Sequence, residues 1–220
     1  MLIPSIVILD YGVGNLHSVW HACKQFSENV TVISDFSEYS PATHIVLPGV
    51  GAFNVAISEI RKRRFDELIN SSIKEQTPIL GVCIGMHVLA KIGFENGENS
   101  GLGIFDAEVR HLSEQAEIDE QRIPHIGWTK VETTNNESQA NNDLEISGYF
   151  YFAHSFGYVD LPKPYILREA VVGKLRIPAV VKSGSVTGVQ FHPEKSGANG
   201  LRFLRKFFET GRNNSEQKIS

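Results

Sequence analysis

Three short apolar runs in the first half of the chain constrain its fold more than any other feature. They span Ile6–Leu9, Ile45–Leu47 and Ile79–Val82, and each ends at a glycine-rich turn. Helix-like stretches, Leu16–Phe26 and Val55–Glu75, lie between them. Near-continuous apolar strands that alternate with helices are typical of a parallel sheet that is buried on both faces. We therefore predict an α/β fold with an open, mostly parallel, doubly wound sheet.

The second half of the chain has strand-like runs with few helical stretches between them. This pattern predicts antiparallel additions to the same sheet, or a small second sheet packed on it. A helix is expected at Asn199–Phe208, a polar surface loop at Thr133–Asp143 and a disordered tail over residues 211–220. The strand-like runs are Glu108–Leu112, Thr129–Thr133, Gly148–His154, Ile166–Val172, Ala179–Lys182 and Val186–Gln190.

The composition argues against several classes of protein. Hydrophobic residues make up 41% and charged residues 21% of the 220 residues, as in an ordinary globular protein, and a net charge of -4 implies no basic face for nucleic acid. No apolar run approaches the roughly 20 residues of a membrane helix. The two cysteines, Cys23 and Cys83, are too few for a disulfide framework or a thiolate-rich metal site. We expect a cytoplasmic protein with no metal, membrane or nucleic-acid partner.

The third apolar run ends at a cysteine that is placed to act as a nucleophile. Cys83 follows the strand directly, within LGVCIGM, and the sites of doubly wound sheets lie at the carboxyl ends of the strands. The flanking glycines permit a tight, strained strand-to-helix turn that exposes the side chain, as in a nucleophile elbow. The helix expected from Met86 to Ile92 points its dipole at Cys83 and favours a thiolate. The backbone N–H of Ile84 is well placed to hold an oxyanion.

A nucleophilic thiol needs a base, and the base needs an acid that orients it. The segment GVQFHPE offers both, because a strand-like run brings His192 to its end and Glu194 follows two residues later. Glu194 is close enough in sequence to reach back to the imidazole and fix its tautomer. The alternative for His192 taken alone is a satisfied structural histidine. The combination of both segments favours a catalytic triad of Cys83, His192 and Glu194.

Together, GVCIGM and GVQFHPE resemble the class I (triad) glutamine amidotransferases. The segments LDYGVGNLHSV, LPGVGAF, PHIGW and FYFAHSF look like one branch of that family, the glutaminase subunits of imidazole glycerol phosphate synthases in histidine biosynthesis. The resemblance runs from about Ile6 to Phe208. It implies a class I glutamine amidotransferase domain over residues 1–210.

The resemblance also implies a reaction and a partner. Glutamine is hydrolysed through a glutamyl thioester without a cofactor, and the ammonia passes to a (β/α)8-barrel cyclase or synthase subunit in a heterodimer. Cys83 is then the nucleophile, His192 the acid and base, and Glu194 the residue that orients His192.

Two further segments are implied to surround the substrate. The loop Gly49-Val50-Gly51 should supply the second oxyanion N–H beside that of Ile84, and its glycines let the backbone approach the substrate and change conformation. A partner that reorients a peptide there would switch the enzyme on. His154, Ser155 and Phe156 match the segment that lines the glutamine pocket, through backbone groups, although an ordinary edge strand is the alternative.

The segment PHIGW matches a region near the synthase interface of the family. Pro124 and Trp128 are therefore implied to lie at the partner interface, and Asn15, in the first βα turn, is expected to face the same interface. A tryptophan next to glycine suits a contact hot spot. The alternative is that Trp128 is a plain core residue.

One position departs from the family pattern. The family usually has glutamine four residues after the nucleophile, where this chain has His87. The i,i+4 spacing points His87 toward the site, but imidazole does not offer the paired donor and acceptor of an amide. Substrate affinity, or the preferred amide, therefore differs from the family pattern unless the substitution is simply tolerated.

Several other interpretations stay open. The segments GFENG and GLG look closer to paralogues that supply ammonia for amidating surface-polysaccharide sugars. A stand-alone hydrolase of γ-glutamyl bonds, or a catalytically weakened binding or regulatory module, would have the same fold. A dinucleotide site is disfavoured because His17 stands where the fingerprint needs glycine. A metal site at His17 and His21 lacks an evident third ligand.

Overall fold

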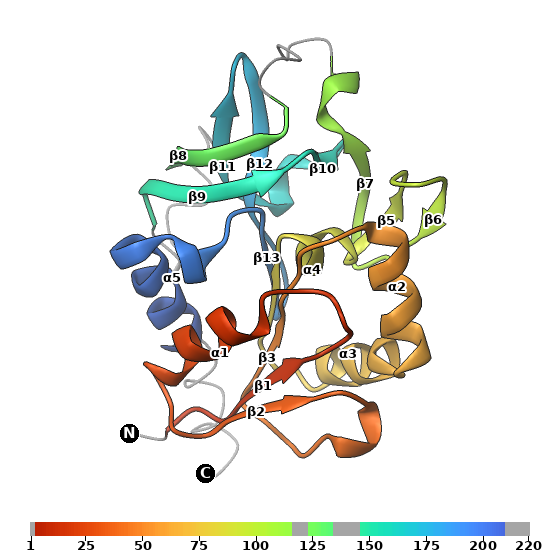
Figure 1. Ribbon diagram of the computed structural model, residues 1–220, viewed down its shortest axis with the longest axis vertical. Coiled ribbons are helices and arrows are strands. Elements are labelled where there is room, and N and C mark those ends of the chain that lie inside the picture. The colour runs from red at the N-terminus through yellow and green to blue at the C-terminus, as the bar shows by residue number, and fades with distance from the viewer. Residues whose placement is uncertain (1–2, 116–122, 134–145, 210–220) are drawn as a thin grey trace.

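The main sheet runs through both halves of the chain. The computed structural model describes residues 3–115, 123–133 and 146–209. In these residues the sheet contains β1 (Ile6–Leu9), β2 (Val30–Ile33), β3 (His44–Leu47), β4 (Ile79–Val82), β8 (His125–Thr133), β9 (Gly148–His154), β11 (Ile166–Val172), β12 (Leu175–Ser183) and β13 (Val186–Val189). Their order across the sheet is β2-β1-β3-β4-β13-β12-β11-β8-β9 (Figure 1).

The direction of the strands confirms the predicted fold class. Neighbouring strands from β2 to β13 pair in parallel, and the pairings from β13 to β9 are antiparallel. Every residue of β1, β3, β4 and β13 is buried, which explains why these strands read as apolar runs. The strand β2 was not predicted from the sequence, and its middle residues are exposed because it lies at the edge of the sheet.

Helices cover both faces of the parallel part. On one face lie α1 (Leu16–Lys24) and α5 (Gly197–Glu209), and on the other lie α2 (Phe53–Lys62) and α3 (Phe65–Lys74) (Figure 1). Each pair packs into its own buried apolar cluster against the sheet. The single helical stretch expected at Val55–Glu75 is two helices, because Arg64 adopts a left-handed conformation with φ 57° between them. The short helices are α4 (Ile84–His87), η1 (Phe36–Glu38), η2 (Leu112–Glu114), η5 (Lys163–Tyr165) and η6 (Pro193–Lys195).

A second sheet lies beside the first, so both alternatives for the second half of the chain occur. It consists of β5 (Ala90–Gly93), β6 (Asn99–Ser100), β7 (Phe105–His111) and β10 (Phe156–Val159) in the order β10-β7-β5-β6. The chain crosses from β9 in the main sheet to β10 in the second sheet at Ser155.

The prediction of a helix from Met86 to Ile92 was wrong. The helical turn α4 ends at His87, and the chain continues as β5, which pairs with β7. Gly101 packs closely on the start of β5, where a Cβ at position 101 would lie 2.1 Å from the carbonyl oxygen of Ala90. Long-range strand pairing therefore overrides the local helical pattern.

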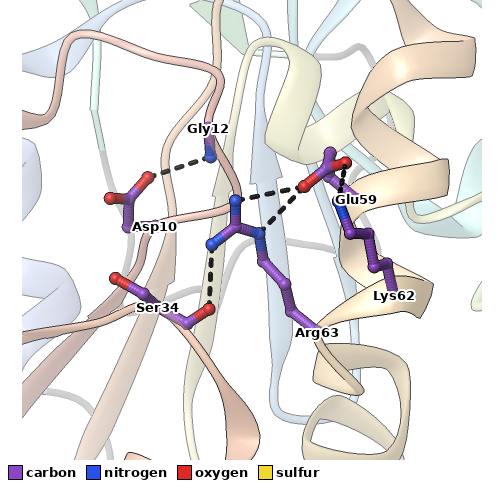
Figure 2. Close-up of polar contacts among 6 residues, drawn as sticks. All are labelled: Asp10, Gly12, Ser34, Glu59, Lys62 and Arg63. Atoms are coloured by element: carbon purple, nitrogen blue, oxygen red, sulfur yellow. Dashed lines mark hydrogen bonds and ion pairs between the residues drawn. The ribbon is translucent and has the colours of Figure 1, made fainter.

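Arg63 ties the end of α2 to the loop that follows β2 (Figure 2). Its guanidinium lies 3.1 Å from Glu59 Oε2 and donates to the Ser34 carbonyl at 3.0 Å. Beside it, Asp10 Oδ1 accepts the Gly12 N–H at 2.9 Å, and this bond shapes the first turn after β1. These contacts fix two loops at the carboxyl edge of the sheet.

Some expectations lie outside the described residues. They are the tail over residues 211–220 and the surface loop beyond Thr133, and the assignment of residues 1–210 to one domain stays a prediction. In the described parts of the chain, no helix is both long enough and apolar enough to cross a membrane.

Candidate active site

The carboxyl ends of four adjacent strands converge on one edge of the sheet. The strands β1, β3, β4 and β13 are neighbours in the sheet order. The segments after β3, β4 and β13 are the glycine loop, the cysteine turn and the His-Pro-Glu segment that the sequence singles out. This edge is where a doubly wound sheet places its ligands.

Cys83 occupies a strained turn between β4 and α4. Its backbone has φ 53° and ψ -108°, which is costly for a residue with a Cβ. The turn is held by its neighbours, since a Cβ on Gly85 would lie 1.9 Å from the Leu47 carbonyl oxygen. Cys83 is only 4% exposed, so the expectation of an exposed side chain was wrong, although the residue lines a cavity. Because α4 is a single turn, it supplies little of the expected dipole.

His192 and Glu194 form a buried pair. The 3₁₀ turn η6 folds the chain back after His192, so that His192 Nδ1 lies 2.9 Å from Glu194 Oε1. Their side chains are 2% and 3% exposed. The backbone of His192 is fixed by a 2.8 Å bond from its N–H to the Tyr151 carbonyl. With Nδ1 bound to the carboxylate, Nε2 remains for the thiol.

The protonation of His192 depends on both neighbours. Burial has the largest influence on the pKa of His192 and lowers it, but hydrogen bonds to Cys83 and Glu194, and their negative charges, together raise it to about 10. The histidine is therefore an imidazolium at neutral pH and can donate its Nε2 proton.

A cavity of about 280 Å³ opens next to Cys83. Of the residues predicted for the substrate site, all but Gly49 line it, and Pro124 from the predicted partner interface lines it too. Asn15, Trp128, His192 and Glu194 do not line it. The lining residues are Val50, Gly51, Cys83, Ile84, His87, Glu95, Pro124, Ile126, Ala153, His154, Ser155 and Phe156.

The glycine loop after β3 packs directly on the cysteine turn. Gly49 is buried, and a Cβ there would lie 2.8 Å from Ile84 Cβ and from the Gly85 nitrogen. Gly51 has φ 123°, which only glycine adopts readily. The Tyr11 hydroxyl donates to the Pro48 carbonyl and anchors the start of the loop. These contacts bring Val50 to the mouth of the cavity beside Ile84.

The far wall of the cavity is ordered by a chain of hydrogen bonds. His154 Nδ1 donates to the Phe156 carbonyl at 2.7 Å, so its Nε2 accepts from His125 Nδ1 at 2.9 Å. His125 Nε2 in turn accepts from the Thr129 hydroxyl at 2.7 Å. Burial lowers the pKa of both histidines, which agrees with the neutral tautomers that this chain requires.

Four residues of the site were missed, of which Ile126 and Ala153 only line the cavity. Glu95 lines the cavity, and its carboxylate also accepts the Phe53 N–H at the start of α2. The signal in the sequence was Ala52, which precedes α2 and has no side chain that could cap the helix. Gln190 is fully buried, and it lies between His87 and Cys83. Its position, two residues before His192 on the same extended segment, was the signal.

The residues predicted for a partner interface are mostly exposed. Trp128 is 55% exposed, so the alternative that it is a plain core residue was wrong. It lies near Ile126, which is 62% exposed, and both project from β8. Asn15 caps α1, with its side-chain oxygen 3.4 Å from the Ser18 nitrogen.

The exposed histidines of α1 lie together, with His17 Nε2 and His21 Nε2 3.0 Å apart. Among the described residues, no group of three or more His, Cys, Asp or Glu side chains is arranged to hold a metal ion.

Comparison with known proteins defines the class of this enzyme. Residues 7–210 match the family model for glutamine amidotransferase class-I. The chain therefore belongs to the class-I glutamine amidotransferases, and it is an enzyme of that family.

Curated relatives of similar length share one name, "Imidazole glycerol phosphate synthase subunit HisH". The protein of Oceanobacillus iheyensis is 35% identical over 93% of this chain and 98% of its own length. Those of Streptococcus sanguinis and Salinibacter ruber are 39% and 40% identical, over 93% and 91% of this chain and 95% and 92% of their own lengths.

Solved structures show the same fold. A putative GMP synthase subunit from Thermoplasma acidophilum has a TM-score of 0.70 at 18% identity, and each chain is covered completely. PurLQS from Thermotoga maritima has a TM-score of 0.69 at 20% identity, over 94% of this chain and 98% of that one.

Proposed function

We propose that the chain is the glutaminase subunit of an imidazole glycerol phosphate synthase. It hydrolyses L-glutamine to glutamate and ammonia and passes the ammonia to a (β/α)8-barrel synthase subunit. The observation that carries the proposal is the buried pair of His192 and Glu194 beside Cys83 at the cavity. The names of the relatives support the synthase as the partner.

The reaction begins with the Cys83 thiolate. Its sulfur attacks the carbon of the substrate's side-chain amide, a C–S bond forms, and the carbonyl electrons move to the oxygen. The N–H groups of Ile84 and Val50 hold this oxyanion in the cavity, and each such donor is typically worth a factor of about 10² to 10³ in rate.

His192 carries the proton through the rest of the cycle. The imidazolium donates its Nε2 proton to the amide nitrogen, the C–N bond breaks, and ammonia leaves a glutamyl thioester on Cys83. The neutral imidazole then takes a proton from water as the hydroxyl adds to the thioester. The C–S bond breaks, glutamate departs and the thiolate is restored. Glu194 holds the imidazole in the required tautomer throughout.

The cavity walls suit an amino acid. The carboxylate of Glu95 attracts the α-ammonium group of glutamine, and the backbone around Ser155 offers hydrogen bonds along one edge. His87 lies on the same wall as the nucleophile, where the family usually has glutamine.

The partner docks on the exposed apolar rim of the cavity. Val50, Ile126 and Trp128 are 40%, 62% and 55% exposed, and Pro124 and Asn15 extend the same interface. Val50 belongs both to this rim and to the loop that supplies the second oxyanion donor. Docking that reorients the loop would therefore raise the glutaminase rate.

Exchange of Glu194 for glutamine tests the acid and base role. The raised pKa of His192 keeps the imidazolium present below a pH of about 10, and proton donation to the departing amide nitrogen is lost as the pH rises through that value. Glu194→Gln removes the negative charge and leaves only a neutral amide oxygen to accept from Nδ1, so the alkaline limb of kcat against pH should move to lower pH and the rate should fall by about 10² to 10⁴. If the alkaline limb of folded Glu194→Gln protein does not move, the acid and base role of His192 is contradicted.

Reconstitution with the partner tests the proposed function as a whole. Glutamate release should rise by about 10² or more when the barrel synthase and its acceptor are added, because one oxyanion donor accounts for that factor. Equal rates with and without them would overturn the partner dependence. Stimulation only by a sugar-amidating partner would overturn the histidine pathway, and no glutamate release in any combination would indicate the non-catalytic module.

A further inference from the structure

The side chain of Gln190 contacts the nucleophile in addition to His192. Gln190 is fully buried just after β13, and its backbone N–H is bound to the Ala179 carbonyl at 3.1 Å. Its amide nitrogen lies 3.8 Å from Cys83 Sγ, within reach of a hydrogen bond to sulfur. The amide oxygen lies 2.8 Å from His87 Nε2.

The proton of His87 decides which way the amide of Gln190 faces. Burial lowers the pKa of His87 to about 4, so this ring is neutral and carries one N–H. Nδ1 is buried, and none of the described residues is a hydrogen-bond partner for it. A buried acceptor without a partner is less costly than a buried N–H without one, so the proton sits on Nε2 and donates to the Gln190 oxygen. The amide N–H₂ of Gln190 must then face Cys83.

The opposite arrangement is unfavourable at both ends. A flipped Gln190 would direct an oxygen lone pair at the Cys83 thiolate. It would also require His87 to bury its N–H at Nδ1 without a partner. The three residues therefore form one directed chain, from His87 through Gln190 to the sulfur.

We infer that Gln190 is a positioning residue for Cys83, held by His87, and that it donates a hydrogen bond which stabilises the thiolate. His87 then acts on the nucleophile through Gln190, in addition to lining the substrate cavity. This inference rests on the proposed role of Cys83 as the nucleophile. According to the inference, His87, which stands where the family usually has glutamine, helps to set the reactivity of the Cys83 thiol.

Alkylation of the substrate-free enzyme tests the inference. The rate of reaction of Cys83 with iodoacetamide is measured against pH, and peptide mass mapping separates it from Cys23. A hydrogen bond to an anion favours the charged form, so Gln190→Met should move the pH midpoint of alkylation up by about one unit and slow the reaction about tenfold below it. An unmoved midpoint in folded Gln190→Met protein would overturn the inference.

Variants of His87 test the chain of bonds. His87→Phe should move the midpoint in the same direction, and His87→Gln, which restores a donor to Gln190, should leave it in place. The double variant His87→Phe and Gln190→Met should have the same midpoint of alkylation as Gln190→Met alone, because both residues act through one hydrogen bond to the sulfur. Additive shifts would contradict this. A role of His87 in substrate contact only would raise KM and leave the midpoint of the substrate-free enzyme unchanged.

Two controls separate the possible failures. His44 is a buried histidine at the other end of the parallel strands, and His44→Phe should not move the midpoint. Cys83→Ala distinguishes this inference from the proposed function. If Cys83→Ala abolishes glutaminase activity while Gln190→Met leaves the midpoint unmoved, only the positioning role fails. If Cys83→Ala keeps its glutaminase activity, both the proposed function and the positioning role of Gln190 fail.

Discussion

Replacing Cys83 with alanine should abolish the glutamine-dependent reaction and spare the reaction supplied with free ammonia. The thioester cannot form without the sulfur, and loss of a catalytic nucleophile typically costs a factor of about 10⁴ to 10⁶ in kcat. The ammonia-dependent reaction takes place on the partner and does not need the thiol. Both rates are measured with the reconstituted synthase, using glutamine or an ammonium salt as the nitrogen source.

The second cysteine provides a matched control. Cys23 is fully buried in the apolar cluster between α1 and the sheet, so Cys23→Ala should keep the glutamine-dependent rate within a few-fold. Cys83→Ser, which keeps the shape of the turn, should lose nearly as much as Cys83→Ala. A Cys83→Ala enzyme that still uses glutamine would refute the nucleophile.

Replacing Gly85 with alanine should have the second-largest effect, and this effect is on stability. A Cβ at this position would lie 1.9 Å from the Leu47 carbonyl oxygen and 2.8 Å from its carbon, which are backbone atoms of a central strand. The methyl group can be accommodated only if β3 and the cysteine turn move apart. We expect a loss of more than about 3 kcal/mol in the free energy of unfolding. For a chain of this size the midpoint of thermal unfolding should fall by at least about 6 °C.

Gly184, in the turn between β12 and β13, is the matched control for Gly85. It has φ 56°, and a Cβ there would meet no atom within 4 Å. Gly184→Ala should cost only the left-handed conformation, about 1 kcal/mol. Circular dichroism during heating measures both variants. Equal unfolding midpoints for Gly85→Ala and Gly184→Ala would show that close packing of the cysteine turn on β3 is not what requires glycine at position 85.

The parallel core could be predicted because its signal is local and strong. Strands such as β1 and β4 are buried along their whole length, so each is an uninterrupted apolar run that ends at a turn. The short elements could not be predicted in the same way. The strand β5 exists because it pairs with β7, and its own four residues are too short a segment to show a strand pattern.

The same distinction between local and long-range features applies to the candidate site. Cys83, His192 and Glu194 were predicted from two compact motifs, since glycine, proline and a two-residue spacing are properties of the local chain. The burial of Cys83 was not predicted, because it depends on the loops that pack around the turn. Glu95 and Gln190 were missed for a similar reason, as each contacts its partner across a long sequence separation.

The sequence by itself determined the three buried parallel strands of the first half, the cysteine turn and the pairing of a histidine with a glutamate. These features depend on backbone conformation and on residues close in the chain. Only the tertiary structure decided what His87 contacts. Its partner, Gln190, lies 103 residues further along the chain, and the two meet because β13 pairs with β4. Burial at that junction then keeps His87 neutral, with its proton on Nε2. This proton orients the amide of Gln190, which donates a hydrogen bond to Cys83.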